Sequence, residues 1–237
     1  MSTICIDIGN TRLKWRPADS EEVQSAMHDG EPAALLRELD TLRDRAVRIS
    51  QNHGTEAEAA LRAAAEAAGA RDIVFARTQA ERDGLRIAYA EPARLGVDRF
   101  LAMLALWRER RAGDEEAGAG TALTLDIVED SGRHLGGYIA PGLHGMRAAV
   151  LDRTRFPHAF DAPATDAPGT STEGCVAEAA LAAALGLLER GQRRFGLPGY
   201  IGGGDAATLI AHLPREDWTL REHLVLDGLA AFEEVED

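Results

Sequence analysis

The alternation of apolar and polar positions at the start of the chain predicts a β-hairpin. Residues 3–8 are mostly β-branched and apolar, the turn formers Gly9 and Asn10 follow, and an apolar pattern resumes at residues 13–15. Short apolar runs separated by turn-forming residues are typical of two antiparallel strands joined by a tight turn. We therefore expect the chain to open with a strand, a turn and a second strand.

Helical and strand patterns alternate along the rest of the sequence, which indicates an α/β fold. Ala-rich or apolar residues at helical spacing predict helices at 56–68, 98–111, 172–190 and 224–232. The first helix leads into an apolar strand at 73–76, and a strand at 200–201 runs into the glycines 202–204. Three prolines within residues 156–169 predict an exposed loop, which fits either a lid or a plain connector.

A domain boundary is expected near the middle of the chain. Residues 112–118 are small and acidic and show no periodicity. After them a strand at 121–128, a polar turn and a second strand near 135–139 repeat the layout of the opening hairpin. We therefore expect two domains, 1–113 and 114–237.

Composition narrows the class of protein. Among the 237 residues, 26 basic against 39 acidic side chains give a net charge of −13, which disfavours nucleic acid and anionic membranes as partners. With 45% hydrophobic and 27% charged residues, the chain has the balance of a soluble globular protein. It has only two cysteines, no N-terminal basic and apolar segment, and no long apolar run, so we expect a reduced, cytoplasmic protein. The histidines show no zinc-ligand spacing.

One basic residue stands out, because Lys14 is the only lysine in a chain that otherwise uses arginine. A compact ammonium fits beside a nucleotide phosphate where a wide guanidinium does not. The nearby hairpin supplies the other requirements of a phosphate site: a carboxylate at Asp7, a residue without Cβ at Gly9, and polar donors at Asn10 and Thr11. An ordinary hairpin with a solvated Asp7 and an exposed Lys14 accounts for the same residues.

Two further motifs allow a functional and a structural interpretation. Small residues at 118–120 feed a strand with Thr121 and Thr124, and together with the glycines 202–204 they fit a second phosphate turn. Taken singly, the threonines are explained by their strand propensity and the glycines by tight turns. Asp98, ahead of an apolar helix, fits either an N-cap or a base for a substrate hydroxyl, with Arg99 as a clamp for a carboxylate.

Taken together, these motifs resemble the type III pantothenate kinase family over nearly the full chain. The matching segments are 7–11 with Lys14, 96–99, 120–126, 136–142 and 203–206. The resemblance implies two RNase H-like (actin-like) α/β domains of the acetate and sugar kinase superfamily, and a homodimer. It also implies ATP-dependent phosphorylation of pantothenate to 4'-phosphopantothenate, the first step of coenzyme A biosynthesis.

The resemblance also assigns residue roles. It makes Asp98 the catalytic base and Asp7 the Mg²⁺ ligand. It gives the ATP contacts to Asp7, Gly9, Asn10, Thr11, Lys14 and Thr121. It gives pantothenate binding to Tyr89, Gly96, Val97, Asp98, Arg99 and Thr172. Structural alternatives are an aromatic residue in a half-buried strand for Tyr89, and a capping box of Thr170 and Glu173 beside Thr172.

The sequence departs from the family pattern at Gly118. Many family members have an aspartate there, which helps to bind an activating monovalent cation. The glycine leaves a requirement for K⁺ or NH₄⁺ open. Two alternative functions remain beside the pantothenate kinase: a kinase of another small hydroxy compound, and a non-catalytic regulatory relative that binds nucleotide or a transcription partner.

Overall fold

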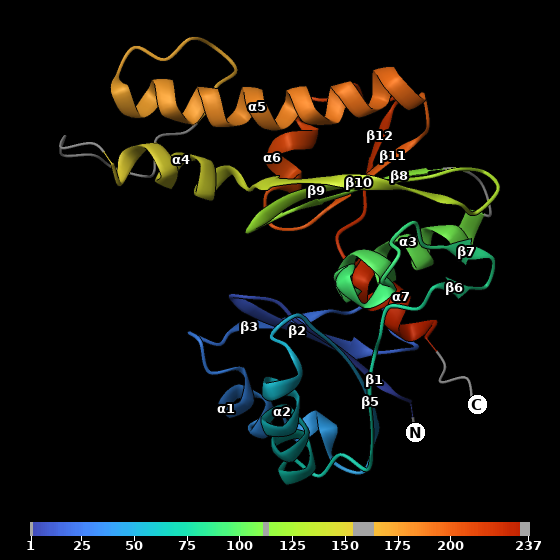
Figure 1. Ribbon diagram of the computed structural model, residues 1–237. Helices are drawn as coiled ribbons and strands as arrows, with labels where there is room; N and C mark the ends of the chain where they lie inside the picture. The colour runs from blue at the N-terminus through green and yellow to red at the C-terminus, as the bar shows by residue number, and fades with distance from the viewer. Residues whose placement is uncertain (1, 111–113, 154–163, 233–237) are drawn as a thin grey trace. The chain divides into compact units, whose positions relative to one another are not determined.

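The computed structural model describes residues 2–110, 114–153 and 164–232, and the chain forms two compact units (Figure 1). The first unit combines Met1–Glu109 with Leu224–Asp237, and the second comprises Arg110–His223. Of the loop expected at 156–169, residues 156–163 lie outside the described part. In that part, no helix has the length and apolar character needed to cross a membrane.

A five-stranded sheet forms the centre of the first unit, with the strand order β3-β2-β1-β4-β5. Its strands are β1 (Ile4–Ile8), β2 (Arg12–Pro17), β3 (Gln24–Met27), β4 (Ala46–Gln51) and β5 (Asp72–Phe75). β1 runs antiparallel to β2 and parallel to β4, so the expected opening hairpin is confirmed. Residues 4, 6 and 8 of β1 are buried in one apolar core with residues of the helices α1 (Pro32–Arg37) and α2 (Thr55–Ala67).

The remaining elements of the first unit follow β5, and the last of them returns from the end of the chain. They are the hairpin β6 (Glu81–Arg82) and β7 (Leu85–Arg86), the helix α3 (Val97–Arg110) and the helix α7 (Leu224–Ala230). Short 3-10 turns lie at Asp40–Leu42 and Pro92–Arg94. The side chains of α3 are buried without interruption from Phe100 to Trp107, so no polar face interrupts this stretch.

The position of α7 differs from the domain division expected from sequence, which assigned residues 224–237 to the second domain. Leu226 and Leu229 are buried, and α7 packs on β1 and β4. The nearly buried Arg16 pairs with Asp227 at 2.6 Å. Arg48 donates to the carbonyls of the last turn of α7, at 3.4 Å and 3.1 Å. Apolar burial and these charged contacts place α7 in the first unit.

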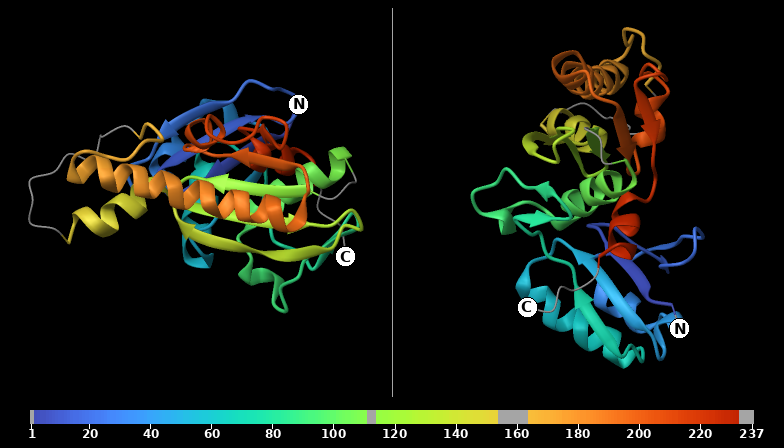
Figure 2. Two further views of the ribbon diagram at one scale, coloured as in Figure 1. Left: turned by 90° about the horizontal axis from the view of Figure 1, so that it is seen from above. Right: turned by 90° about the vertical axis from the view of Figure 1, so that its right-hand side faces the viewer.

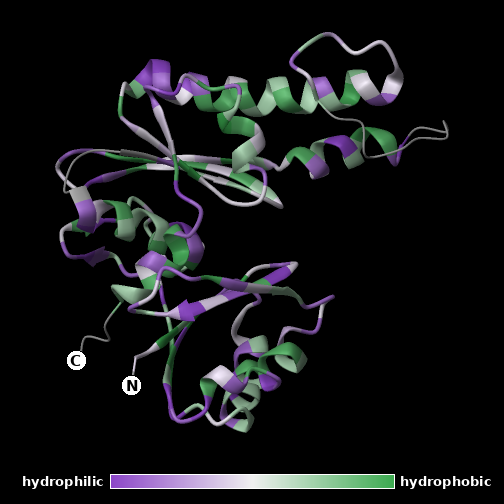
Figure 3. Ribbon diagram, turned by 180° about the vertical axis from the view of Figure 1, so that it is seen from behind, coloured by the Kyte–Doolittle hydropathy of each residue, from purple (hydrophilic) through white to green (hydrophobic). Residues whose placement is uncertain are grey.

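The second unit repeats the strand order of the first as β10-β9-β8-β11-β12. Its strands are β8 (Asp114–Ala119), β9 (Ala122–Val128), β10 (His134–Pro141), β11 (Gly199–Gly202) and β12 (Trp218–Leu220). Its helices are α4 (Leu143–Leu151), α5 (Thr172–Phe195) and α6 (Ala206–Ile210). α5 lies along the sheet, and green apolar stretches alternate with purple polar ones along this helix (Figures 2 and 3). The expected strands at 121–128 and 135–139 and the helix at 172–190 are present.

The expected linker at 112–118 is wrong for residues 114–118, because they belong to the central strand β8. β8 pairs with β9 on one side and with β11 on the other. Ala117 and Ala119 are buried in a core with residues of α5, where small side chains allow close approach. β8 is therefore the counterpart of β1, and the hairpin at 121–139 is the counterpart of β2 and β3.

Candidate active site

The turn between β1 and β2 places a carboxylate and an ammonium side by side. Asp7 and Lys14 are register partners on the two antiparallel strands, so both side chains lie on the same face of the sheet. The turn itself is closed by a hydrogen bond of 3.0 Å from the Gly9 N–H to the Arg12 carbonyl. Asn10 and Thr11 are exposed at its tip. The sequence-predicted phosphate motif thus forms one surface feature.

The electrostatics of Asp7 link this turn to the start of α3. Burial, followed by the nearby carboxylate of Asp98, raises the pKa of Asp7 to about 6. The hydroxyl of Ser50 and the ammonium of Lys14 act in the opposite direction on this pKa. Two of the predicted functional carboxylates therefore lie within electrostatic reach of each other in the first unit.

Asp98 lies in the first turn of α3 and is not its N-cap. The helix begins at Val97, and the carbonyl of Gly96 accepts the first helical hydrogen bond from the Phe100 N–H at 3.1 Å. One carboxylate oxygen of Asp98 accepts the Arg99 N–H at 2.8 Å. A Cβ at Gly96 would stand 2.5 Å from that oxygen, so glycine leaves room for the carboxylate. The side-chain oxygen of Asn52, which the sequence analysis missed, would stand 3.7 Å from the same Cβ.

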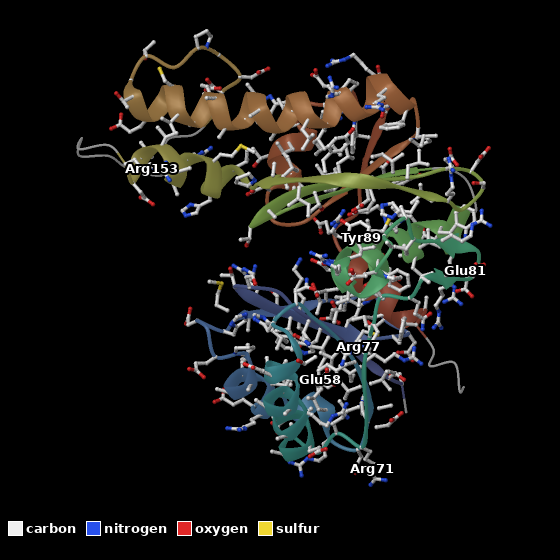
Figure 4. The ribbon with its side chains drawn as sticks, in the orientation of Figure 1. Glu58, Arg71, Arg77, Glu81, Tyr89 and Arg153 are labelled. Carbon is white, nitrogen blue, oxygen red and sulfur yellow. The ribbon has the colours of Figure 1, made fainter. Side chains whose placement is uncertain are left out.

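Tyr89 and Arg99, two of the residues predicted to bind the substrate, contact each other. Tyr89 lies in the loop after β7, beside α3 (Figure 4), and not in the half-buried strand offered as an alternative. Arg99 donates to the Tyr89 hydroxyl at 3.3 Å, and its side chain is almost buried. A guanidinium and a phenol held together in this way can bind a carboxylate and a hydroxyl of a substrate.

Gly118, Thr121 and Thr172 belong to the second unit. Thr121 is exposed at the turn between β8 and β9, and a Cβ at Gly118 would stand 2.8 Å from the Thr124 hydroxyl oxygen. The turn after β11 runs into α6, as expected for the glycines 202–204.

The helix α5 begins differently from the predicted capping box. Ser171 is its N-cap and accepts the Gly174 N–H at 3.1 Å, so the pairing of Thr170 with Glu173 is wrong. Thr172, the first helical residue, lines a pocket of about 830 Å³ between α4 and α5. This pocket is largely apolar, with Met146 and Val150 on the side of α4.

The oxygen ligands of the first unit suit a magnesium ion that also binds phosphates and water. They do not suit a metal ion held by protein side chains alone. Among the described residues, no group of three or more His, Cys, Asp or Glu side chains is arranged to hold a metal. Mg²⁺ is usually bound by one or two carboxylates together with substrate phosphates and water. Asp7, partly exposed next to a turn of polar donors, matches that requirement.

A model of the type III pantothenate kinase family matches residues 3–194. The chain belongs to this family. A type III pantothenate kinase of Marinobacter nauticus is 37% identical over 234 residues, covering 95% of this chain and 96% of the relative. Another, from Xanthomonas axonopodis pv. citri, is 37% identical over 252 residues and covers 98% and 97%. The family resemblance predicted from the motifs is thereby confirmed.

Solved structures confirm the predicted fold class for this pantothenate kinase family member. A putative Baf family transcriptional activator from Campylobacter jejuni superposes with a TM-score of 0.63 at 17% identity, covering 96% of each chain. MreB5 of Spiroplasma citri bound to ADP gives a TM-score of 0.54 at 10% identity, covering 98% of this chain and 95% of that one. At such low identity the likeness concerns the fold alone, which is the two-domain actin-like fold.

Proposed function

We propose that this protein transfers the γ-phosphoryl group of ATP to the primary hydroxyl of pantothenate, giving 4'-phosphopantothenate and ADP. This reaction is the first step of coenzyme A biosynthesis. Family membership over residues 3–194 supports the reaction class. The observation that carries the proposal at the level of residues is the meeting of Asp7, Lys14 and Asp98 in the first unit.

On the nucleotide side, the turn between β1 and β2 binds the phosphates. The exposed Asn10 and Thr11 donate hydrogen bonds, Gly9 allows close approach of the backbone, and Lys14 contributes positive charge. Asp7 holds Mg²⁺, which neutralises charge on the phosphate oxygens when it is bound. The carboxylate of Asp7 is ionised above its raised pKa of about 6, so this side chain is ready to bind a cation at neutral pH.

On the acceptor side, Asp98 orients the hydroxyl of pantothenate and accepts its proton. The hydroxyl oxygen forms the new bond to the γ-phosphorus, the bond from that phosphorus to the bridging oxygen breaks, and ADP leaves with the electron pair. Proton transfer accompanies bond formation, so Asp98 does not need the basicity to ionise an alcohol beforehand. Arg99 pairs with the carboxylate of pantothenate, assisted by the hydroxyl of Tyr89.

Gly96 and Val97 complete the acceptor side, because they form the backbone that carries Asp98 into α3. For Thr121 and Thr172, the family motifs support contacts to ATP and to pantothenate respectively. The same family membership supports a homodimer in the cytoplasm. Because Gly118 lacks a carboxylate, we propose activity without a requirement for K⁺ or NH₄⁺.

The test is ADP release by the purified protein with Mg-ATP, with and without pantothenate, for the wild type and Asp98→Asn. We expect pantothenate-dependent turnover in the wild type and a loss in kcat of about 10²–10⁴-fold in the variant, the usual contribution of a positioned base. Nucleotide affinity should stay within about twofold, because Asp98 serves the acceptor. Asp19→Asn, which changes an exposed carboxylate in a turn of the same unit, is the matched control.

Other outcomes would point to the alternatives. Full turnover by Asp98→Asn would remove the role of this residue as base. ADP release with another small hydroxy compound and not with pantothenate would favour a kinase with a different acceptor. Nucleotide binding without any turnover would favour a regulatory relative.

A further inference from the structure

The carbonyl oxygen of Gly9 accepts hydrogen bonds from two histidines that the sequence analysis did not single out. His28 reaches it through Nε2 at 2.9 Å, and His53 reaches it through Nε2 at 3.3 Å. Their rings pack edge to face, with centroids 6.2 Å apart. His28 directly follows β3 and His53 lies two residues after β4, so two different strand ends converge on the nucleotide turn.

The hydrogen bonds of His28 define which ring nitrogen carries the proton. The Gly30 N–H donates to His28 Nδ1 at 3.3 Å, so Nδ1 is an acceptor. The proton of the neutral ring is therefore on Nε2, which donates to the Gly9 carbonyl. The backbone N–H of His28 also donates to the Thr11 carbonyl at 3.2 Å. His28 thus holds the turn at both Gly9 and Thr11, and its side chain is only 5% exposed.

The orientation of this carbonyl also fixes the direction of the next N–H group. The described chain contains no cis peptide bond, and in a trans peptide the C=O and the N–H point in opposite directions. With the Gly9 carbonyl directed at the two histidines, the N–H of Asn10 points away from them. No protein group among the described residues accepts this N–H.

We propose that His28 and His53 are positioning residues of the nucleotide site, which hold the Gly9 peptide so that the Asn10 N–H is presented to the phosphates of ATP. The inference rests on the proposed function insofar as that function assigns the turn to ATP. The histidines themselves act through Gly9 and do not touch the reacting atoms. Their contribution is preorganisation, because a fixed donor needs no reorientation when the anion binds.

A pair of substitutions at one position isolates the Gly9 hydrogen bond. Glutamine extends its amide nitrogen to about the position of Nε2, so His28→Gln keeps the donor to Gly9. Asparagine ends near the position of Nδ1, so His28→Asn can still accept the Gly30 N–H but loses the bond to Gly9. The same pair at the partly exposed His53 avoids the risk that changes at His28 prevent folding. His212→Asn controls for loss of a histidine, since His212 contacts Asp166 and not the turn.

The measurement is the Kd of a non-hydrolysable ATP analogue with Mg²⁺ by calorimetry, together with the KM values for ATP and pantothenate. We expect His28→Asn to raise the Kd and the KM for ATP about tenfold, the effect of losing one orienting hydrogen bond. We expect His28→Gln to stay within about threefold of the wild type, and His53→Asn to raise the Kd about threefold because its bond is longer. The KM for pantothenate should not change.

The outcomes separate this inference from the proposed function. Equal nucleotide Kd values for folded His28→Asn, His28→Gln and wild type would overturn the positioning role even if pantothenate is phosphorylated. Weakened binding in His28→Asn that glutamine rescues would support the role even if pantothenate proves not to be the acceptor. A lower melting temperature with unchanged Kd would show a purely structural role and would overturn the inference.

Discussion

The turn between β1 and β2 and the turn between β8 and β9 occupy the same place in two sheets of the same strand order. In each, the N–H of a glycine closes the turn onto the start of the next strand. The bonds are 3.0 Å from Gly9 to Arg12 and 3.1 Å from Gly120 to Ala122. Both turns are thus closed by a glycine N–H, although the second turn is one residue shorter than the first.

The two turns are held in place by different means. The residue after β3, His28, donates its backbone N–H to the Thr11 carbonyl at 3.2 Å. The residue after β10, Gly142, donates its N–H to the Thr121 carbonyl at 3.1 Å. In the first unit a histidine ring then reaches over to the glycine carbonyl. In the second unit Gly142 packs so closely that a Cβ would collide with the carbonyl oxygen of Gly120.

The residues that follow β4 and its counterpart β11 show the same contrast. His53 bonds to the Gly9 carbonyl in the first unit. In the second unit, Gly203 lies against the Ala119 carbonyl, where a Cβ would collide, and Asp205 donates its N–H to that carbonyl at 3.1 Å. Side chains orient the first turn, whereas close backbone packing orients the second. A Cβ at Gly142 or at Gly203 would therefore collide with the backbone of the second turn.

The two turns also differ in the charge of the side chains on their flanking strands. The register pair Asp7 and Lys14 of the first unit corresponds to the uncharged pair Gly118 and Thr124 of the second. The first turn thus combines a carboxylate with a cation, whereas neither residue of the second pair carries a charge. We therefore expect the electrostatic part of the proposed catalysis to come from the first unit.

The largest expected effect tests the close packing of the second turn. Gly142→Ala should lower the free energy of unfolding by about 3 kcal/mol, because the new methyl group overlaps the Gly120 carbonyl and the backbone must shift. Gly120→Ala is the matched control, since a Cβ there meets nothing within 4 Å, and it should change the free energy of unfolding by less than about 1 kcal/mol. Urea unfolding measures both. Similar losses for the two variants would contradict the packing argument.

The next effect concerns the charge of Asp7. Its folded-state pKa of about 6 lies above the ordinary value of 3.8, so folding with an ionised Asp7 is unfavourable above pH 6. This cost disappears as the pH falls from 6 to below 3.8, where the carboxyl is protonated in both states. At 1.4 kcal/mol per pKa unit, and allowing for partial exposure, we expect Asp7→Asn to stabilise the metal-free protein by about 2 kcal/mol at pH 8.

The measurement for Asp7 is urea unfolding in EDTA at pH 8 and at pH 4. We expect a gain in stability for Asp7→Asn at pH 8 that is largely lost at pH 4, with loss of kinase turnover in the same variant. Asp19→Asn should show no such pH-dependent gain, because its carboxylate is exposed. An equal change in stability at both pH values would rule out the stated cause.

A smaller effect compares the two threonines of the turns. Thr11→Val and Thr121→Val each remove one hydroxyl while keeping the shape of the side chain. Each should raise the KM for ATP about fivefold, which corresponds to about 1 kcal/mol for one hydrogen bond. Thr219→Val on β12, an exposed strand position, is the control and should leave this KM unchanged. An effect at Thr11 alone would show that the second turn does not contact ATP.

Local patterns made the opening hairpin and the helices α2, α3 and α5 predictable from sequence. The central strand β8 was not predictable in this way, because Glu116, Ala117 and Gly118 carry no alternation of large apolar residues. Its stability comes from backbone pairing with two neighbouring strands. The only signal was that Gly118 and Gly120 repeat the spacing of Asp7 and Gly9.

The candidate site was predictable where its residues are close in sequence. The turn motif and the segment 96–99 each form one local feature, and the structure brings Asp98 within electrostatic reach of Asp7. The contacts of His28 and His53 with Gly9 were not predictable, because these histidines lie 19 and 44 residues from Gly9 in the sequence. Only the pairing of strands in the sheet brings them to it. The place of α7 depends likewise on tertiary contacts, such as the pair Arg16 and Asp227.

The smallest expected effect is that of the monovalent cation, and it tests the charge difference between the turns. Turnover with Mg-ATP and pantothenate should differ by less than about twofold among K⁺, NH₄⁺ and Na⁺ at constant ionic strength, which is within about 0.4 kcal/mol. The reason is that Gly118 offers no carboxylate to compensate the cost of removing water from such an ion. The Thr124 hydroxyl also lies 2.8 Å from where a Cβ at this position would be. A rate at least tenfold higher in K⁺ than in Na⁺ would show that another group binds the cation, with the Glu116 carboxylate, whose Oε1 lies 3.9 Å from the same point, as the first candidate.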